Sequence, residues 1–172
     1  MWRVWFIFII TSIPLGCCFA GIPLGSYEAS PPDVLRETDL VGMWQAQYGT
    51  SRIDKITLKA DGTYQQIFEA PLDEYYFKSD WNKWYVEYSS SGKPKLHLEK
   101  MGYCVYFLDE CESTRRGEPK LYYDFSENKS VKLTGKVILQ ITIDETNPRG
   151  IRLWHLQIDE DVGPAFFVSV DE

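Results

Sequence analysis

The stretch DLVGMWQAQYGTSRIDKITLKADGTYQQIF, from Asp39 to Phe68, decides the fold. Within it, Ile56 and Leu58 alternate with lysine and threonine residues, which is the period of two typical of a half-buried strand. An Asp-Gly pair follows, and this pair favours a tight turn between two antiparallel strands. The stretch therefore predicts a β-hairpin with one buried face.

Two loop lengths are compatible with this hairpin. A two-residue loop would set Gln65 opposite Leu58. A three-residue loop, with Gly62 in the left-handed conformation, pairs Lys59 with Thr63 and sets Tyr64 beside Leu58. We predict the three-residue loop, since a slip of one residue would move the apolar set to solvent. The residues that then share the buried face are Ile56, Leu58, Tyr64 and Phe68.

The chain beyond this hairpin also reads as strands. Apolar alternation or aromatic enrichment marks the stretches WNKWYVEYS, PKLHLEKM, KLYYDF, VKLTGKVILQITID, IRLWHLQID and FFVSV. Turn residues separate these stretches, and the one place for a short helix is Pro32 to Thr38. The pattern predicts an all-β domain of about eight or nine strands, an antiparallel up-and-down β-barrel or a closely related β-sandwich.

The first twenty residues, MWRVWFIFIITSIPLGCCFA, have the features of an export signal: one early arginine, an apolar run and small residues near the end. Cleavage after Ala20 would give a secreted protein. The run IPLGCC resembles a bacterial lipoprotein signal with lipidation at Cys17, although Pro14 stands where that signal usually has a branched aliphatic residue. An uncleaved anchor is the third possibility. All three predict an extracytoplasmic domain at residues 39–172, behind a flexible tether at residues 21–38.

Two cysteines, Cys104 and Cys111, remain outside this signal. Their even number and the oxidising compartment favour a disulfide that closes a short loop. A metal site would need more ligands, because His97 and His155 are the only histidines of the chain. We predict the disulfide, no metal and no cofactor.

Composition restricts the partners. The chain has 172 residues, a length that supports one core, and its net charge is −7. Nucleic-acid affinity depends largely on lysine and arginine contacts to phosphates, so an acidic chain with scattered basic residues is not expected to bind nucleic acid.

The stretch VGMWQAQY resembles the Gly-x-Trp first strand of lipocalin-like (calycin) barrels, and DKITLKADGTYQQIF resembles the next two strands of bacterial members. The resemblance implies that Gly42 permits a close approach and that Trp44 plugs the closed end. It also implies a basic residue over the tryptophan, for which Arg152 is the candidate, in a cation–π contact of about 0.5–2 kcal/mol. A barrel of this size is filled by side chains or holds one small ligand.

Catalytic signatures are absent from the sequence. The paired carboxylates stand in runs beside turn residues, where we expect them to be solvated: Asp73-Glu74, Asp109-Glu110 with Glu112, and Asp159-Glu160-Asp161. His97 falls on the polar side of its strand, and a lone strand histidine such as His155 is more often a packed residue than a base. We therefore predict no catalytic residues and no enzyme.

Seven aromatic residues are concentrated between Tyr75 and Tyr88. Trp81 and Trp84 are three positions apart and fall on opposite faces of a strand, so one of them should be exposed. Our first functional prediction is a membrane-tethered barrel that binds a small apolar molecule, with Tyr64, Phe68, Trp81 and Trp84 as candidate contacts. The alternative is a filled barrel that serves as an envelope protein-interaction module.

Overall fold

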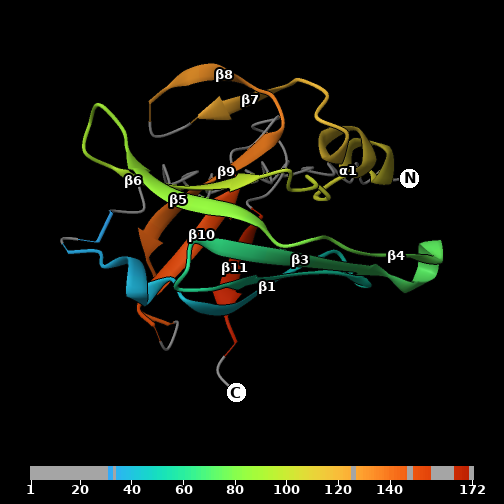
Figure 1. Ribbon diagram of the computed structural model, residues 1–172, viewed down its shortest axis with the longest axis horizontal. Coiled ribbons are helices and arrows are strands. Elements are labelled where there is room, and N and C mark those ends of the chain that lie inside the picture. The colour runs from blue at the N-terminus through green and yellow to red at the C-terminus, as the bar shows by residue number, and fades with distance from the viewer. Residues whose placement is uncertain (1–30, 33, 125–126, 147–148, 156–164, 171–172) are drawn as a thin grey trace, which may run out of the picture.

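The computed structural model describes residues 31–32, 34–124, 127–146, 149–155 and 165–170 (Figure 1). The expected signal sequence and most of the expected tether therefore lie outside the described residues. Eight antiparallel strands close a barrel, as predicted, in the order β1, β2, β3, β5, β6, β9, β10, β11 and back to β1. The bounds of these strands are β1 Gly42–Tyr48, β2 Arg52–Leu58, β3 Thr63–Ala70, β5 Asn82–Tyr88, β6 Pro94–Glu99, β9 Lys136–Ile143, β10 Ile151–His155 and β11 Phe166–Ser169.

The hairpin of β2 and β3 has the predicted register. The Lys59 amide donates to the Thr63 carbonyl oxygen at 2.8 Å, and Leu58 lies opposite Tyr64. Gly62 adopts a φ of 77°, the left-handed conformation that the three-residue loop requires. The four residues expected on the buried face, Ile56, Leu58, Tyr64 and Phe68, are buried.

The short strand β4 (Tyr75–Lys78) interrupts the regular barrel. It follows the 3-10 helix η2 (Pro71–Asp73) and pairs with the distal half of β3, while β5 pairs with the proximal half. The aromatic run that the sequence shows as one block is thus divided between two strands, with residues 79–81 between them. β3 and β4 extend together away from the rest of the barrel (Figure 1).

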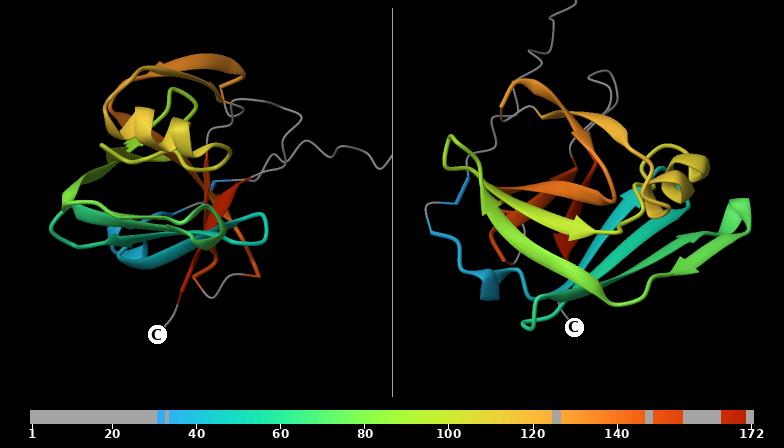
Figure 2. Two further views of the ribbon diagram at one scale, coloured as in Figure 1. Left: turned by 90° about the vertical axis from the view of Figure 1, so that its right-hand side faces the viewer. Right: turned by 45° about the horizontal axis from the view of Figure 1, so that its top comes forward.

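Two elements lie outside the barrel wall. The hairpin of β7 (Lys120–Asp124) and β8 (Lys129–Leu133) stands against the β6–β9 side, where Asp124 pairs with Lys95 and accepts a hydrogen bond from Gln140 (Figure 2). The helix α1 (Leu108–Arg115) lies near the end where β1 and β2 meet in their turn (Figure 2). The short helix η1 (Glu37–Asp39) precedes β1, close to the predicted position.

The helix α1 is not what the sequence predicted. A helical stripe is hard to recognise here, because the eight residues LDECESTR carry only two apolar positions. The buried positions of α1 are instead mostly polar or charged: Glu110, Cys111, Ser113 and Thr114. None of the helices in the part of the chain that the structure describes is long and apolar enough to cross a membrane.

Trp44 lies near the start of β1, at the end of the barrel that we call the closed end. Its side chain is fully buried, and its indole Nε1 donates to the Leu40 carbonyl oxygen at 2.7 Å. The basic residue over the indole is Arg149, whose Cζ lies 5.7 Å from the ring centroid, so the prediction of Arg152 was wrong. Arg152 extends from the outward side of β10, where its guanidinium binds Asp144 at 2.7 Å and stacks on Phe166 at 4.1 Å.

Gly42 admits the Arg149 guanidinium to this end. Gly42 has a φ of 132°, and a Cβ built on it would collide with Arg149 Nη2. We expect Gly42→Ala to lower the free energy of unfolding by about 2 kcal/mol, because it adds both backbone strain and a clash. Gly49→Ala is the matched control, since Gly49 has a φ of 63° but nothing within 4 Å, and it should cost about 1 kcal/mol. Equal losses in urea denaturation would show that neither the φ of 132° at Gly42 nor the contact with Arg149 adds to the cost.

Candidate binding site at the barrel mouth

The centre of the barrel is filled by its own side chains. Tyr64 and Phe68, the expected lining of an apolar ligand cavity, have 0% exposure. The Tyr64 hydroxyl donates to the Glu99 carbonyl oxygen at 2.7 Å, and the Phe68 ring stacks on Phe77 with centroids 6.0 Å apart. Both residues therefore serve the core in this structure.

The end opposite Trp44 is covered by the plug segment, Met101–Val105, which connects β6 towards α1. Its side chains are buried, and its backbone is held from inside the barrel by Gln66. The Gly102 amide donates to Gln66 Oε1 at 2.9 Å, and Gln66 Nε2 donates to the Gly102 carbonyl oxygen at 3.0 Å. The plug segment is thus fixed by hydrogen bonds that water cannot easily replace.

The disulfide between Cys104 and Cys111 joins the plug segment to α1, as predicted, and both cysteines are fully buried. The Tyr103 amide adds a hydrogen bond to Thr114 Oγ1 at 2.8 Å. Arg52 holds Tyr106, the residue that follows the plug segment. Its Nη1 donates to the Tyr106 carbonyl oxygen at 2.7 Å, and its Nε donates to Asp73 at 3.1 Å.

Replacing both cysteines by alanine is expected to lower the free energy of unfolding by about 2–3 kcal/mol, since the bond closes a short loop. Urea denaturation of the oxidised protein and of the variant measures this difference. Dithiothreitol should destabilise the wild type to the level of the variant and leave the variant unchanged. Free Cys104 and Cys111 thiols in the protein purified from its own host would contradict the disulfide.

A hydrogen-bonded polar cluster lies beneath the plug segment. Gln66 Nε2 donates to both carboxyl oxygens of Asp54, at 3.0 and 3.1 Å. The Tyr48 hydroxyl lies 3.3 Å from Asp54 Oδ2 and 2.8 Å from His155 Nε2. The four side chains come from β1, β2, β3 and β10, so closure of the barrel brings them together.

Burial alters the acidity of these groups. Loss of solvation raises the pKa of Asp54 to about 8 against the lowering effect of hydrogen bonds from Gln66 and Tyr48. Loss of solvation also lowers the pKa of His155 to about 3. At neutral pH the cluster therefore holds a mostly protonated carboxyl and a neutral imidazole.

Protonation of Asp54 also satisfies the hydrogen bonding. The Tyr48 hydroxyl has one hydrogen to donate. If the Asp54 carboxyl donates to the Tyr48 oxygen, the phenol is free to donate to His155 Nε2. An ionised Asp54 fits the same contacts only with the other tautomer of His155, in which Nε2–H donates to the Tyr48 oxygen and the phenol donates to Asp54.

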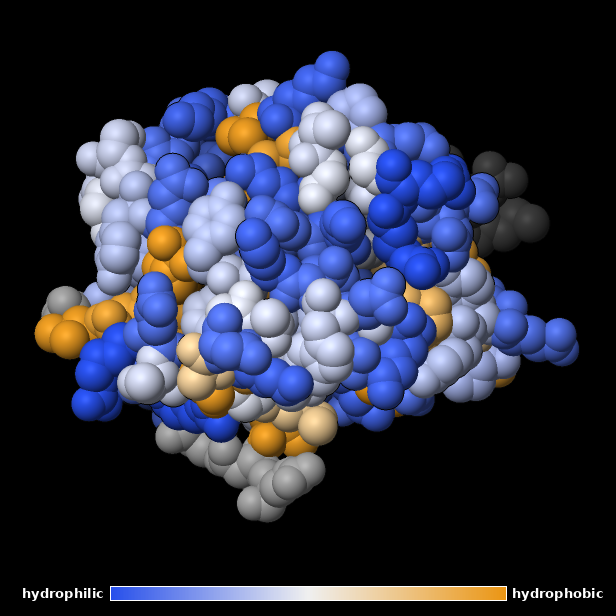
Figure 3. Space-filling view, in the orientation of Figure 1, coloured by the Kyte–Doolittle hydropathy of each residue, from blue (hydrophilic) through white to orange (hydrophobic). Residues whose placement is uncertain are grey.

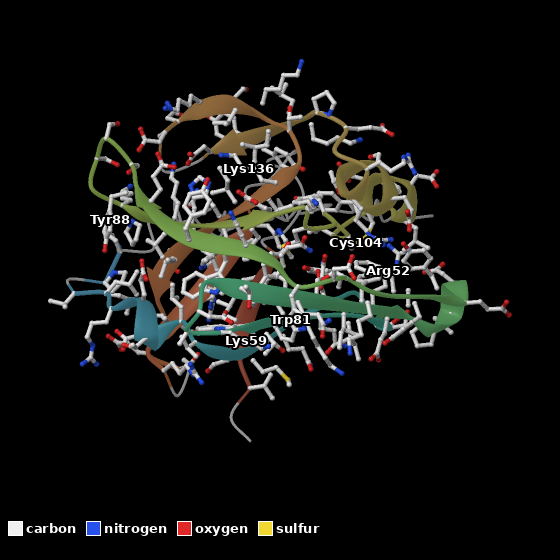
Figure 4. The ribbon with its side chains drawn as sticks, in the orientation of Figure 1. Arg52, Lys59, Trp81, Tyr88, Cys104 and Lys136 are labelled. Atoms are coloured by element: carbon white, nitrogen blue, oxygen red, sulfur yellow. A yellow bond between two sulfur atoms is a disulfide. The ribbon has the colours of Figure 1, made fainter. Side chains whose placement is uncertain are left out.

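Tyr48 connects the cluster to a pocket at the surface. This mouth pocket has a volume of about 260 Å³ and is lined by Tyr48, Gly49, Thr50, Ser51, Arg52 and Val105. Figure 4 shows Arg52 near Cys104 at the end of the barrel where α1 lies. Most of the wall is polar, and Val105 of the plug segment supplies the aliphatic contact.

The predicted tryptophan contacts lie elsewhere. Trp84 is buried, and its Nε1 donates to the Lys59 carbonyl oxygen at 2.9 Å. Trp81 is 43% exposed, so one member of the pair is exposed, as the alternation predicted. Lys59 Nζ lies 3.4 Å from the Trp81 ring centroid, and the two side chains lie together in Figure 4. None of the four candidate contacts lines the mouth pocket.

Two polar residues, one expected on the polar side of its strand and one expected to be solvated, are buried. His97 is covered on the outer side of β6, where it stacks on Tyr85 with centroids 4.7 Å apart and lies 3.2 Å from Glu87 Oε2. Loss of solvation is the main cause that lowers the pKa of His97 to about 4. Glu110 is buried on α1, and this burial raises the pKa of its carboxyl. The expectation of a polar face at His97 and of a solvated Glu110 was wrong.

Asp54 and Gln66 are not among the predicted site residues, although the sequence carries a signal for them. Asp54 is in phase with Ile56 and Leu58, and Gln66 stands between Tyr64 and Phe68 on the same face. A polar residue at a core position of an alternating strand needs a buried partner. Here each supplies a partner for the other.

Neither a metal-binding cluster nor a similar known protein identifies the site. Among the residues described, no group of three or more histidine, cysteine, aspartate and glutamate side chains could hold a metal ion. No family model, curated protein or solved structure matches this chain.

Proposed function

We propose that the protein is an extracytoplasmic, non-enzymatic barrel of lipocalin-like type that binds a small molecule with polar groups at the mouth pocket. The observation that carries this proposal is the opening of the pocket onto Tyr48. Tyr48 also belongs to the polar cluster, where its hydroxyl lies between Asp54 and His155. The Thr50 and Ser51 hydroxyls and the Arg52 guanidinium, which line the same pocket, can bond a ligand hydroxyl, amide or carboxyl.

The mouth pocket favours a polar ligand over the purely apolar one that the sequence suggested. Tyr64 and Phe68 are packed in the core and leave that part of the interior filled. The wall of the mouth pocket presents Thr50, Ser51 and Arg52, with Val105 as an apolar contact. Small-molecule sites generally combine apolar contact with a few convergent polar groups.

A non-catalytic role is supported by burial. Asp54 is fully buried and His155 is nearly so. Neither side chain is therefore exposed to a substrate in solution. Export is supported by the apolar N-terminal sequence and by the disulfide. We propose lipidation at Cys17 as the membrane anchor. The contacts of Arg149 with Gly42 and Trp44 at the closed end support the lipocalin-like relationship.

Native mass spectrometry of the protein purified from its own host tests ligand binding. We expect a retained adduct of small-molecule mass in the wild type. Thr50→Trp, which places a large ring at the rim of the pocket, should reduce the adduct at least about tenfold, a loss of about 1.4 kcal/mol in binding. Thr134→Trp, at an exposed threonine away from the pocket, is the matched control. An adduct that survives Thr50→Trp unchanged would contradict the mouth site.

The filled interior also favours a second candidate function, an envelope protein-interaction module. Trp81 supports it, because this exposed indole lies under Lys59 on the outer surface. Aromatic residues are enriched in protein interfaces. A retained protein partner that is lost in Trp81→Ala, with no small-molecule adduct in the same spectra, would favour this module.

A further inference from the structure

The outer edge of β4 is an unpaired strand edge. β4 ends the sheet order, and none of the strands in the described parts of the chain pairs with its other side. The Ser79 amide donates to Gln66 at 2.8 Å, and alternation along an antiparallel strand then directs the backbone groups of Tyr76 away from β3. Such an edge is a template for another strand.

The side chains along this edge are exposed on one face and supported on the other. Tyr76 is 62% exposed, and Glu74 and Lys78 are exposed beside it. On the opposite face, Tyr75 bonds to Glu112 of α1, and the Arg115 guanidinium stacks on Phe77 at 4.1 Å. The helix α1 therefore supports the inner face of the short strand and leaves its edge open.

The sequence of this edge is complementary to itself. Glu74 directly precedes β4, with a φ of 51° and its amide bonded to the Pro71 carbonyl oxygen. When two copies of β4 run antiparallel about Tyr76, Glu74 at the start of each strand comes near Lys78 at the end of the other. Tyr75 then lies opposite Phe77, and Tyr76 lies opposite its own counterpart. Within the residues the structure describes, neither Glu74 nor Lys78 makes an ion pair.

We propose that two copies of this chain associate by antiparallel pairing of their β4 edges, with the twofold axis at Tyr76. Backbone hydrogen bonds provide the pairing, and the two Glu74–Lys78 contacts fix its register. Charge complementarity selects a second copy over an unrelated strand, since the acidic and basic ends match only in the antiparallel arrangement. The four-residue strand makes the association weak and concentration-dependent, and the proposal does not depend on the mouth pocket.

Charge reversal tests the register. Sedimentation velocity of the full-length protein over a range of concentrations should show a monomer–dimer equilibrium. Glu74→Lys alone and Lys78→Glu alone should each weaken the dimer by about tenfold or more, because each creates two like-charge contacts. The double variant should regain the wild-type association, and so should a mixture of the two single variants.

Lys132→Glu on β8 is the control for net charge and should leave the equilibrium unchanged, since Lys132 is an exposed lysine far from β4 in the sheet topology. A protein that stays monomeric at every concentration would overturn the proposal. So would a dimer that the single reversals weaken no more than Lys132→Glu does, or one that the double variant fails to restore.

Cross-linking tests the position of the axis. Under mild oxidation, Tyr76→Cys should form a disulfide between copies, identified as a peptide joined to itself at residue 76. Tyr88→Cys is the matched control, because Tyr88 is 57% exposed and lies at the other end of the barrel from Arg52 (Figure 4). Equal cross-linking of the two variants would overturn the proposed axis.

Discussion

Replacement of Trp44 by alanine is expected to lower the free energy of unfolding by about 3–5 kcal/mol, the range for deletion of a buried aromatic side chain. Trp44 is fully buried at the closed end, and its indole satisfies the Leu40 carbonyl oxygen. The variant would leave a cavity, an unpaired carbonyl and the Arg149 guanidinium without its aromatic contact.

Urea denaturation followed by far-UV circular dichroism measures this loss. Trp81→Ala is the matched control, because it deletes the same side chain at a position that is 43% exposed. We expect the control to cost less than about 1 kcal/mol. Similar losses for both variants would mean that Trp44 does not seal the barrel.

The second large effect is a fall in stability as the pH rises, caused by Asp54. Burial raises the pKa of this carboxyl from 3.8 to about 8 in the folded state, so the folded protein holds a proton that the unfolded chain has released. The contribution of Asp54 to the free energy of unfolding is fully present below pH 3.8 and is lost as the pH rises through about 8. The slope approaches about 1.4 kcal/mol per pH unit.

Two histidines act in the opposite direction at lower pH. Burial lowers the folded-state pKa of His155 to about 3 and that of His97 to about 4, from 6.5. Their contributions to stability are present above pH 6.5 and are lost as the pH falls through the folded-state values. The effect of Asp54 therefore becomes clearest between pH 6.5 and about 8.

The comparison of the wild type with Asp54→Asn isolates this contribution. In the wild type, the free energy of unfolding should fall by about 2 kcal/mol across that window. Asp54→Asn, which keeps the shape but carries no titrating proton, should show a much flatter profile. Glu110, whose pKa is also raised, is common to both proteins and cancels in the difference. Parallel profiles would contradict a protonated Asp54 in the native state.

The sequence was sufficient to predict the strands where the alternation was strict. The register of the β2–β3 hairpin followed from the need to keep Ile56, Leu58, Tyr64 and Phe68 on one face. The burial of Asp54 and Gln66 was predictable from the same alternation, because both residues share its phase. A prediction based on apolar positions alone does not include such a buried polar pair.

Other features depend on contacts that no local pattern encodes. Arg149 reaches Trp44 from the connection between β9 and β10, and only the folded geometry distinguishes it from Arg152 three residues later. The plug segment is likewise positioned by Gln66, by Arg52 and by the disulfide. The prediction for His97 was wrong because the outer face of β6 is also covered. A strand that is buried on both faces does not follow the alternation of buried and exposed residues.

Figure 3 shows a mostly hydrophilic face with only scattered apolar residues, so the surface in that view does not itself mark a binding site.

The location of a bound molecule is the most direct test of the central claim that the barrel binds at its mouth and is filled at its centre. The measurement is a crystal structure of the protein purified from its own host. We predict additional density against Tyr48, Arg52 and Val105. Density in the barrel centre, with Tyr64 and Phe68 displaced, would contradict the account.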